Sequence, residues 1–220
     1  MKTADKSSRD FGRWVAVLVF TLVLIWNIAG TSRSLKYLFP LTATKVLWVA
    51  NHVLTAAFII LVIYLYFRRG SAIATTRSFP AKIIAVFAFV LPFVIPFLGS
   101  VTRLDPVMLV ISNAVMAAGL AFSLAALYAL GRSFSIIPQT RDLVVHGPYR
   151  LVRHPLYVGE IVQYLGLALA GMTIPKALVV LLLVVCQVYR SIQEEKLLTD
   201  TFPEYLDYAS KTARFVPGLF

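Results

Sequence analysis

The sequence predicts an all-α integral membrane protein: a bundle of about six transmembrane helices with a short cytosolic amphipathic helix near its C-terminus. Three observations predict this class. The 220 residues are 59% hydrophobic, with a mean hydropathy of +0.80. Only 14% are charged, whereas about a quarter are charged in a typical soluble domain. The apolar residues also form blocks that approach the 20 or so residues needed to cross a bilayer core.

Six apolar blocks follow one another along the chain, and we expect them to form one compact bundle. They cover residues 14–29, 46–67, 81–98, 106–130, 156–174 and 175–189. Residues 1–130 form the expected N-terminal helical part, and residues 131–220 form the expected functional part. The sixth block is too short to cross upright unless it tilts or the following helix extends it. A five-span version is the alternative.

Local signals add detail to these helices. Pro92 and Pro96 should kink the third span, which membrane helices tolerate. The small residues at 117–119 suit close helix packing in the fourth. Thr201 and Glu204 have the spacing of a capping box and predict the start of the short C-terminal helix. The residues available there to cover the end of the bundle are Tyr205, Leu206 and Tyr208.

The basic residues predict the orientation. The net charge is +11, but the Lys and Arg residues lie between apolar blocks and form no stripe, so we expect no nucleic-acid partner. Of the 21, sixteen share one side if the N-terminus is inside, and five lie on the other. The positive-inside rule therefore predicts that both termini, the polar stretch 131–155 and the tail from Arg190 are cytoplasmic. No cleavage site follows the first block, so we expect a span there rather than a signal peptide.

One polar segment, GPYRLVRHPLYVGE at 147–160, enters the fifth block. His154 lies between Arg153 and Pro155, and proline suits a first helical position. A helix N-terminus flanked by arginine is suited to bind a carboxylate or phosphate. Gly159 would let a ligand approach the backbone closely. A basic loop that only touches lipid headgroups is the alternative.

Three carboxylates lie near this segment or after the last span. Glu160 lies about one turn inside the fifth block, where an ionisable group usually faces the bundle interior or a watery cavity. Its alternative role is structural pairing with an Arg or Tyr. Arg190 and Glu194 share a helix face, although such a pair can be only a weak surface ion pair. Glu195 points about 100° away from Glu194.

Other sequence features restrict the function. Asn51, His52 and Asn113 are expected to form hydrogen bonds between helices. The single cysteine, Cys186, excludes an internal disulfide and a metal site built from cysteines. The motifs of metalloproteases, α/β-hydrolases and dinucleotide-binding folds are absent from the sequence, and we expect no metal.

Three segments together resemble the isoprenylcysteine carboxyl methyltransferase family, whose wider relatives are the phospholipid methyltransferases. They are GPYRLVRHPLYVG at 147–159, R-x-x-x-E-E at 190–195 and TFPEYLDYASKTARFVPGL at 201–219. The resemblance covers roughly residues 131–220. It implies an integral membrane enzyme that uses S-adenosylmethionine (SAM) at the cytosolic face.

The resemblance also implies roles for individual residues. Glu194 would accept a hydrogen bond from the SAM amino group, and Arg190 would face the methyl acceptor. A carboxylate suits an ammonium, a cationic loop at a helix start suits a carboxylate, and tyrosine rings suit an adenine or a sulfonium. Together with the residues already singled out in the loop, the expected cofactor-binding set is Gln139, Arg141, Asp142, Leu143, Val144, Tyr149, Arg153, His154, Pro155, Leu156, Tyr157, Gly159 and Glu194.

The remaining hypotheses differ in the chemical group that accepts the methyl group. An anionic acceptor needs no base, and Arg190 would orient its carboxylate in line with the methyl group. An amine acceptor must lose a proton, for which Glu160 or Glu195 is the candidate catalytic base. We expect a small or lipid-like acceptor, first of all an isoprenylcysteine-type carboxyl, with phospholipid amine or thiol methylation as alternatives. A non-catalytic membrane protein, such as a transporter subunit, is the alternative of a different class. It should show polar midplane residues in paired broken helices, and the first four blocks offer few.

Overall fold

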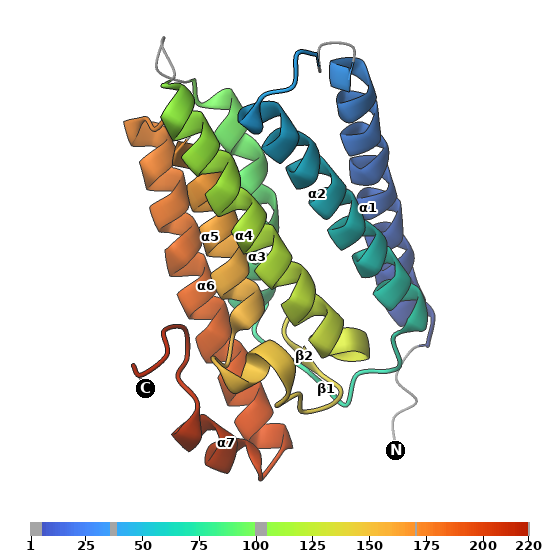
Figure 1. Ribbon diagram of the computed structural model, residues 1–220. Helices are drawn as coiled ribbons and strands as arrows, with labels where there is room; N and C mark the ends of the chain where they lie inside the picture. Colours follow the sequence, from blue (N-terminus) through green and yellow to red (C-terminus); the bar gives the residue numbers. More distant parts are fainter. Residues whose placement is uncertain (1–5, 36–38, 100–104, 170, 220) are drawn as a thin grey trace.

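The computed structural model describes residues 6–35, 39–99, 105–169 and 171–219, and these form a helical bundle (Figure 1). Its helices are α1 (Lys6–Leu35), α2 (Ala43–Arg68), α3 (Phe79–Val90), α4 (Pro106–Leu130), α5 (Pro155–Leu169), α6 (Ile174–Thr201) and α7 (Tyr205–Lys211). Three 3₁₀ segments, η1 (Leu91–Phe97), η2 (Gly131–Ser133) and η3 (Gly147–Arg150), and two short strands, β1 (Ala74–Thr75) and β2 (Gln139–Thr140), complete it. The predicted all-α class is confirmed.

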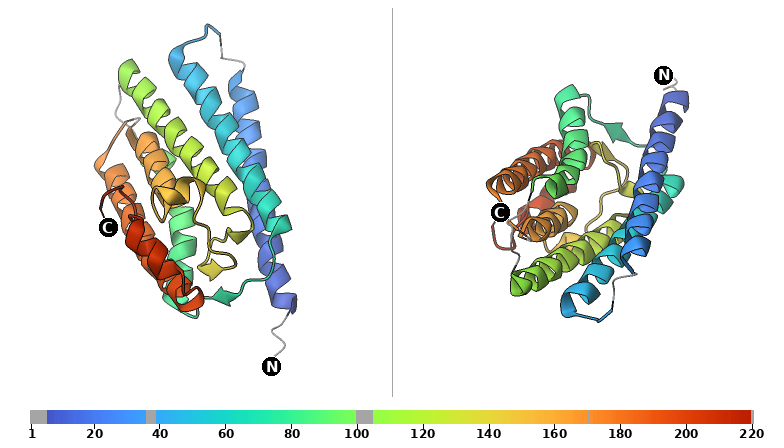
Figure 2. Two further views of the ribbon diagram at one scale, coloured as in Figure 1. Left: turned by 60° about the horizontal axis from the view of Figure 1, so that its bottom comes forward. Right: turned by 90° about the horizontal axis from the view of Figure 1, so that it is seen from above.

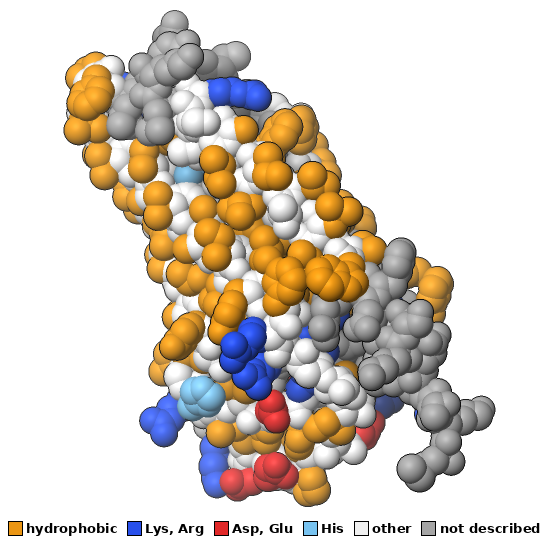
Figure 3. Space-filling view, turned by 90° about the vertical axis from the view of Figure 1, so that its right-hand side faces the viewer, with side chains coloured by type: hydrophobic (Ala, Val, Ile, Leu, Met, Phe, Trp, Pro, Cys, Tyr) orange, Lys and Arg blue, Asp and Glu red, His pale blue; other side chains and the backbone are white. Residues whose placement is uncertain are grey.

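The helices differ in whether they can cross a membrane alone. Within the described residues, four apolar stretches are long enough: 14–33, 43–68, 106–133 and 174–201. The α5 helix has 15 residues, or about 22 Å at 1.5 Å per residue, which is less than the roughly 30 Å of a bilayer core. The α3 helix has only 12. Hydrophobic side chains cover most of the length of the face shown in Figure 3, and the acidic side chains on that face gather near one end.

Two helix boundaries follow the sequence signals, and one does not. The α3 helix ends at Val90, and 3₁₀ turns take over in η1, the stretch that holds both prolines. The α6 helix continues without a break to Thr201, so the helix after the sixth block does extend it. The predicted capping box is wrong. Thr201 is still part of α6 and donates its hydroxyl to the Leu197 carbonyl at 2.6 Å, while Glu204 makes no side-chain cap.

The α4 and α5 helices pack backbone to backbone through glycines. A Cβ atom added to Gly119 would lie 2.4 Å from the amide nitrogen of Gln163, and one added to Gly159 would lie 2.3 Å from Oγ of Ser123. Gly166 is similarly close to the backbone of α4. Small residues permit such close approach between membrane helices, so the predicted packing role of the small residues in α4 is confirmed at Gly119.

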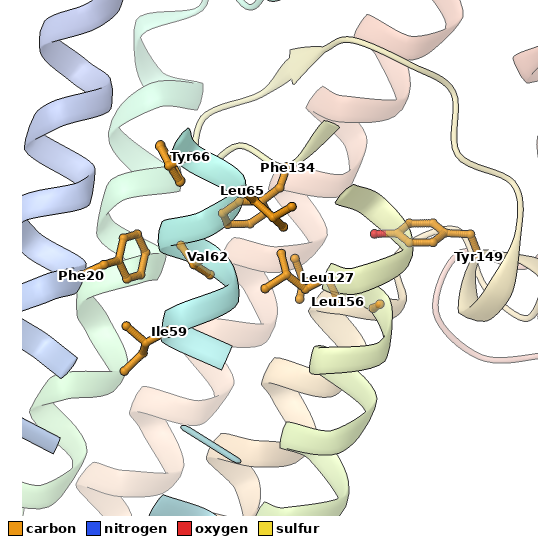
Figure 4. Close-up of a cluster of buried hydrophobic side chains, with 10 residues drawn as sticks. Phe20, Ile59, Val62, Leu65, Tyr66, Leu127, Phe134, Tyr149 and Leu156 are labelled. Carbon is orange, nitrogen blue, oxygen red and sulfur yellow. The ribbon is translucent and has the colours of Figure 1, made fainter. Parts of the chain in front are cut away.

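The first helices join this pair through an apolar cluster. Phe20 of α1, Val62 and Tyr66 of α2, and Leu127 of α4 meet there, as Figure 4 shows. The Asn51 side chain also links α2 to α4 by donating to the Asn113 carbonyl at 3.2 Å and to its side-chain oxygen at 3.0 Å. These two residues bond between helices as expected. The His52 ring instead bonds the Trp48 carbonyl of its own helix at 2.9 Å.

A small antiparallel ribbon fastens the polar loop after α4, and the all-α prediction did not include it. Ala74 pairs with Thr140 and Thr75 with Gln139, so the linker between α2 and α3 lies against the loop. Seen from above, the helices surround this loop (Figure 2). The ribbon, the start of α1 and α7 lie at one end of the bundle, called the α7 end below (Figure 1).

We expect the α7 end to face the cytoplasm because it carries the excess of basic residues. Starting from a Cys186→Ser background, a cysteine at exposed Ser210 should react with an impermeant maleimide only in inside-out vesicles. A cysteine at exposed Thr42, on the segment between α1 and α2, should react only in intact cells. The reverse pattern, or labelling of both sites from one side, would contradict this topology.

Candidate functional site

A cavity lies at the α7 end, and its two sides differ in chemistry. One side is polar. It comes from the loop at 133–137 and 139–144, from residues 152–157 around His154 (the His154 motif below), from the last part of α6, and from Tyr205 and Tyr208 of α7. The other side is apolar and comes from the first three helices. The residues of α1–α3 that line this apolar side are Phe20 of α1, Phe58 of α2, and Ala88 and Phe89 of α3. The cavity therefore connects a polar loop to the apolar interior of the bundle.

Arg190 lies at the centre of a buried polar chain. Its side chain donates from Nη1 to Oε1 of Gln187 at 3.0 Å and from Nη2 to the Ile136 carbonyl at 3.0 Å. Gln187 in turn donates to Oε2 of Glu160 at 2.6 Å.

Two expectations from the sequence can be checked here. Arg190 is only 6% exposed, so the alternative that Arg190 and Glu194 form a surface ion pair is wrong. Glu160 faces the cavity, as expected of an ionisable residue at that depth.

Glu194 also lines the cavity and contacts the His154 motif at the start of α5. The Tyr157 hydroxyl donates to Glu194, and Nδ1 of His154 lies 3.8 Å from the same carboxylate. The His154 and Tyr157 rings stack with centroids 5.4 Å apart, and the Arg190 guanidinium lies 4.6 Å from the Tyr157 ring centre. The His154 motif and the last span therefore converge, as their sequence patterns suggested.

Glu195 faces away from the cavity toward the tail. It accepts from Nη1 of Arg153 at 3.0 Å, from Nε of Arg214 at 2.9 Å and from Nη2 of Arg214 at 2.8 Å. Nε2 of His154 lies 2.9 Å from its Oε1. The hydrogen bond to Glu195 raises the pKa of Arg214. A carboxylate engaged by three such partners is poorly placed to accept a substrate proton, so this geometry does not favour the base role considered for Glu195.

The loop before the His154 motif is held by its own hydrogen bonds. The side-chain oxygen of Gln139 accepts from Nη2 of Arg141 at 2.8 Å and from the Ser135 hydroxyl at 3.0 Å. Arg141 also donates from Nε to the Gly70 carbonyl at 3.1 Å. Gln139 and Arg141 line the cavity, so these bonds fix the shape of its wall.

Two tyrosines close the α7 end of the cavity. Gly147, at φ +59°, makes the turn into η3, and Tyr149 extends from η3 toward the helices (Figure 4). The Tyr208 hydroxyl donates to the Tyr149 carbonyl at 2.6 Å and thereby ties α7 to this turn. Burial raises the pKa of Tyr149, and it raises the pKa of Tyr208 to about 12. Both hydroxyls are therefore neutral near pH 7.

Residues 107–205 match the family model described as phospholipid methyltransferase. The resemblance to membrane methyltransferases is confirmed over that part of the chain. The matched residues contain most of the polar side of the cavity, from the loop after α4 to Tyr205, the first residue of α7. The match supports a membrane methyltransferase.

Curated relatives match over a shorter stretch. The nickel-cobalt-cadmium resistance protein NccN of Alcaligenes xylosoxydans xylosoxydans is 38% identical over 96 residues, which is 43% of this chain and 42% of that protein. The cobalt-zinc-cadmium resistance protein CzcN of Cupriavidus metallidurans is 39% identical over 97 residues, which is 43% of this chain and 41% of that protein. The matched stretch thus spans about two fifths of the length of each relative.

Among solved structures, the eukaryotic intramembrane Ras methyltransferase ICMT (isoprenylcysteine carboxyl methyltransferase) is similar at 18% identity. That alignment covers 93% of this chain and 94% of the other, with a TM-score of 0.44. Within the part of this chain that the structure describes, no group of three or more His, Cys, Asp or Glu side chains is arranged to hold a metal ion.

The structure brings most of the expected site residues together. Those that line the cavity are Gln139, Arg141, Asp142, Leu143, Val144, Tyr149, Arg153, His154, Leu156, Tyr157, Glu160, Arg190 and Glu194. Pro155, Gly159 and Glu195 are not among the lining residues. Pro155 begins α5. The close backbone approach expected at Gly159 is made by α4 and leaves no room there for a ligand.

The sequence patterns did not identify the apolar wall. Phe20, Phe58 and Phe89 lie in unremarkable apolar stretches, and no local signal separates a phenylalanine facing a cavity from one facing lipid. Arg214 was also missed, although a charged residue in an otherwise recognisable tail is a weak signal for a buried partner.

Proposed function

We propose that the protein transfers a methyl group from SAM to a small or lipid-like acceptor at the cytosolic end of the bundle. The observation that carries this proposal is the two-sided cavity. Its polar wall contains the recognisable motif, and its apolar wall comes from helices with no motif. Such a cavity suits a polar cofactor on one side and an acceptor with an apolar part on the other.

The cavity residues fit the groups of SAM. Glu194 offers a carboxylate for the ammonium, and the basic loop at the start of α5 suits the carboxylate. Tyr149 and Tyr157 offer rings for the adenine or the sulfonium. Nε of Arg190 is buried and has no hydrogen-bond partner among the described residues, which favours a polar ligand beside it. SAM would supply a methyl group activated by its positively charged sulfur.

For the acceptor, we propose a carboxylate of the isoprenylcysteine type. Arg190 would orient this carboxylate, while the apolar chain would lie along Phe20, Phe58 and Phe89. A carboxylate acceptor needs no base, so holding the reacting atoms in line would do most of the work. The alternative is a phospholipid amine or a thiol. Glu160, which faces the cavity with one oxygen bonded to Gln187, would then take the proton.

A transfer assay with methyl-labelled SAM tests this proposal. The purified protein in lipid nanodiscs would be offered a farnesylcysteine analogue, phosphatidylethanolamine and a simple alkyl thiol. We expect label on the farnesylcysteine analogue, and we expect mild alkali to release it as methanol, because only a methyl ester is cleaved in this way. Alkali-stable label on the lipid amine or the thiol would favour the alternative. No SAM binding and no label on any acceptor would overturn the proposal.

A contribution to metal resistance is a second proposal, and it rests on the names of the two curated relatives. Methylation of a membrane component would be the means. Deletion of the gene should then lower growth in cobalt or nickel, and the wild-type gene should restore it. An Arg190→Lys variant that restores growth equally well would separate resistance from methyl transfer.

Glu194→Gln is expected to weaken SAM binding about tenfold or more, because a neutral amide loses a charge-assisted hydrogen bond worth about 1.5–3 kcal/mol. The substitution keeps the size of the side chain and an oxygen for the Tyr157 hydroxyl. Calorimetric titration with SAM measures the change. Glu204→Gln, at an exposed carboxylate that does not line the cavity, is the matched control and should bind normally. Equal affinity in both variants would place the SAM ammonium elsewhere.

A further inference from the structure

The chain after α7 returns to the His154 motif. Ala213 forms a parallel bridge with Val152. The backbone amide of Arg153 donates to the Ala213 carbonyl at 2.8 Å, and that of His154 donates to the Arg214 carbonyl at 3.2 Å. This segment lies beyond residues 107–205, the region that matches the family model. The motif is therefore held from outside by a part of the chain that the family match does not cover.

The Arg214 side chain adds a second connection through Glu195. Its Nε and Nη2 contact the two different oxygens of the carboxylate, at 2.9 and 2.8 Å. Such a two-pronged contact fixes the plane of a carboxylate, whereas a single contact leaves it free to rotate. The same two oxygens hold His154 through Oε1 and Arg153 through Oε2. The orientation of the carboxylate therefore sets where both of these side chains point.

His154 is held in this way between the tail and the cavity. One ring nitrogen faces Glu195 at 2.9 Å, and the other faces Glu194 at 3.8 Å. The ring stacks on Tyr157 and lies 5.7 Å from the ring of Phe215, measured between centroids. Glu194 and Tyr157 line the cavity. A rotation of the Glu195 carboxylate would therefore be passed on to the cavity wall through the His154 ring.

We propose that Arg214 is a positioning residue of the methyl-transfer site. It does not line the cavity, and it acts by fixing the Glu195 carboxylate, which in turn orients His154 and Arg153. The proposal rests on the proposed function, because the cavity is taken to hold SAM. It assigns Glu195 an orienting role in place of the base role considered from the sequence.

Two features make Arg214 a usable test position. Its side chain is 36% exposed, so its replacement exposes no large apolar gap. The backbone bonds from Arg153 and His154 to the tail do not involve the guanidinium, so the tail should stay docked when the side chain changes. Two variants test the position. Arg214→Gln removes the charge, and Arg214→Lys keeps the charge but cannot contact both carboxylate oxygens in one plane as a guanidinium does.

Lys211→Gln is the matched control. It removes one positive charge three residues away, from an exposed ion pair with Asp207 at 2.6 Å, and neither Lys211 nor Asp207 lines the cavity. Exposed pairs of this kind contribute little to stability. Arg214→Gln and Lys211→Gln each remove one positive charge, so these two variants can be compared at equal net charge.

The first measurement is the Kd for SAM by calorimetry. We expect a rise of about tenfold for Arg214→Gln, the lower end of the roughly 10–100-fold loss that follows when the hydrogen-bond partner orienting a metal-binding side chain is removed. Arg214→Lys should fall between this value and the wild type. Lys211→Gln should match the wild type. Unchanged affinity in Arg214→Gln would overturn the proposal.

The second measurement needs no ligand. The chain has three histidines, and ¹⁵N-labelled imidazole signals can be assigned with His52 and His146 variants. In Arg214→Gln and Arg214→Lys, the His154 signals should shift and broaden as the ring loses one fixed orientation. In Lys211→Gln they should not. If Arg214→Gln fails to fold, folded Arg214→Lys decides: altered His154 signals support positioning, and unaltered signals overturn it.

These two measurements separate the two proposals. If the wild-type protein binds no SAM, the proposed function fails, and the His154 signals still decide whether Arg214 orients the ring. If the wild type binds SAM and both the signals and the affinity of the Arg214 variants are unchanged, only the positioning role fails.

Discussion

Arg190→Lys is expected to lower kcat/KM for the acceptor on the order of a hundredfold, which is the cost of about 1 Å of misplacement in a reacting pair. The Kd for SAM should change by less than about threefold, or under 1 kcal/mol, because the positive charge remains. The guanidinium is fixed by Gln187, by the Ile136 carbonyl and by the face of Tyr157. A lysine ammonium is a point charge that cannot reproduce this planar arrangement.

Steady-state kinetics for the acceptor and calorimetry for SAM, both with the same variant, measure the two effects. Arg150→Lys is the control, because Arg150 belongs to the same recognisable segment, 147–159, but is exposed and does not line the cavity. Equal losses in kcat/KM and in SAM affinity would move Arg190 into the cofactor-binding group. No loss in either would mean that the acceptor is anchored by another residue.

The convergence of the two functional segments could be predicted because each has a strong local pattern. His154 directly precedes a helix that begins with Pro155, and helical spacing places Arg190 and Glu194 on one face of the next helix. A very short connection makes these two helices neighbours. The charge count placed both segments on one side of the membrane, and the family resemblance implied that His154 and Glu194 share one cofactor site.

The partners of the carboxylates could not be predicted in the same way. Glu194 and Glu195 are adjacent, and only the docking of residues 212–215 against the His154 motif gives one of them to the cavity and the other to the tail. Gly159 shows the same limit. Its missing side chain permits close approach, but the sequence cannot say whether a ligand or α4 is the neighbour.

Gly119→Val is expected to separate α4 from α5 and to abolish measurable SAM binding. A Cβ at this position would lie 2.4 Å from the Gln163 amide nitrogen and 2.7 Å from the Gly159 carbonyl oxygen. Both neighbours are backbone atoms, which no side-chain rotation can move away. Overpacking inside a folded protein typically costs about 1–3 kcal/mol, and a contact with backbone should reach at least the top of that range.

Gly119→Val should reduce SAM affinity by more, in free energy, than it reduces the stability of the folded protein, and the reason is geometric. The α5 helix carries Tyr157 and Glu160 into the cavity, so a shift of α5 by about 1 Å moves one wall against the other. Thermal unfolding in detergent and calorimetry with SAM measure the two effects. Gly30→Val is the matched control, since Gly30 lies in α1 with no heavy atom within 4 Å of an added Cβ. Normal SAM affinity in a folded Gly119→Val protein would show that the cavity does not depend on the contact between α4 and α5.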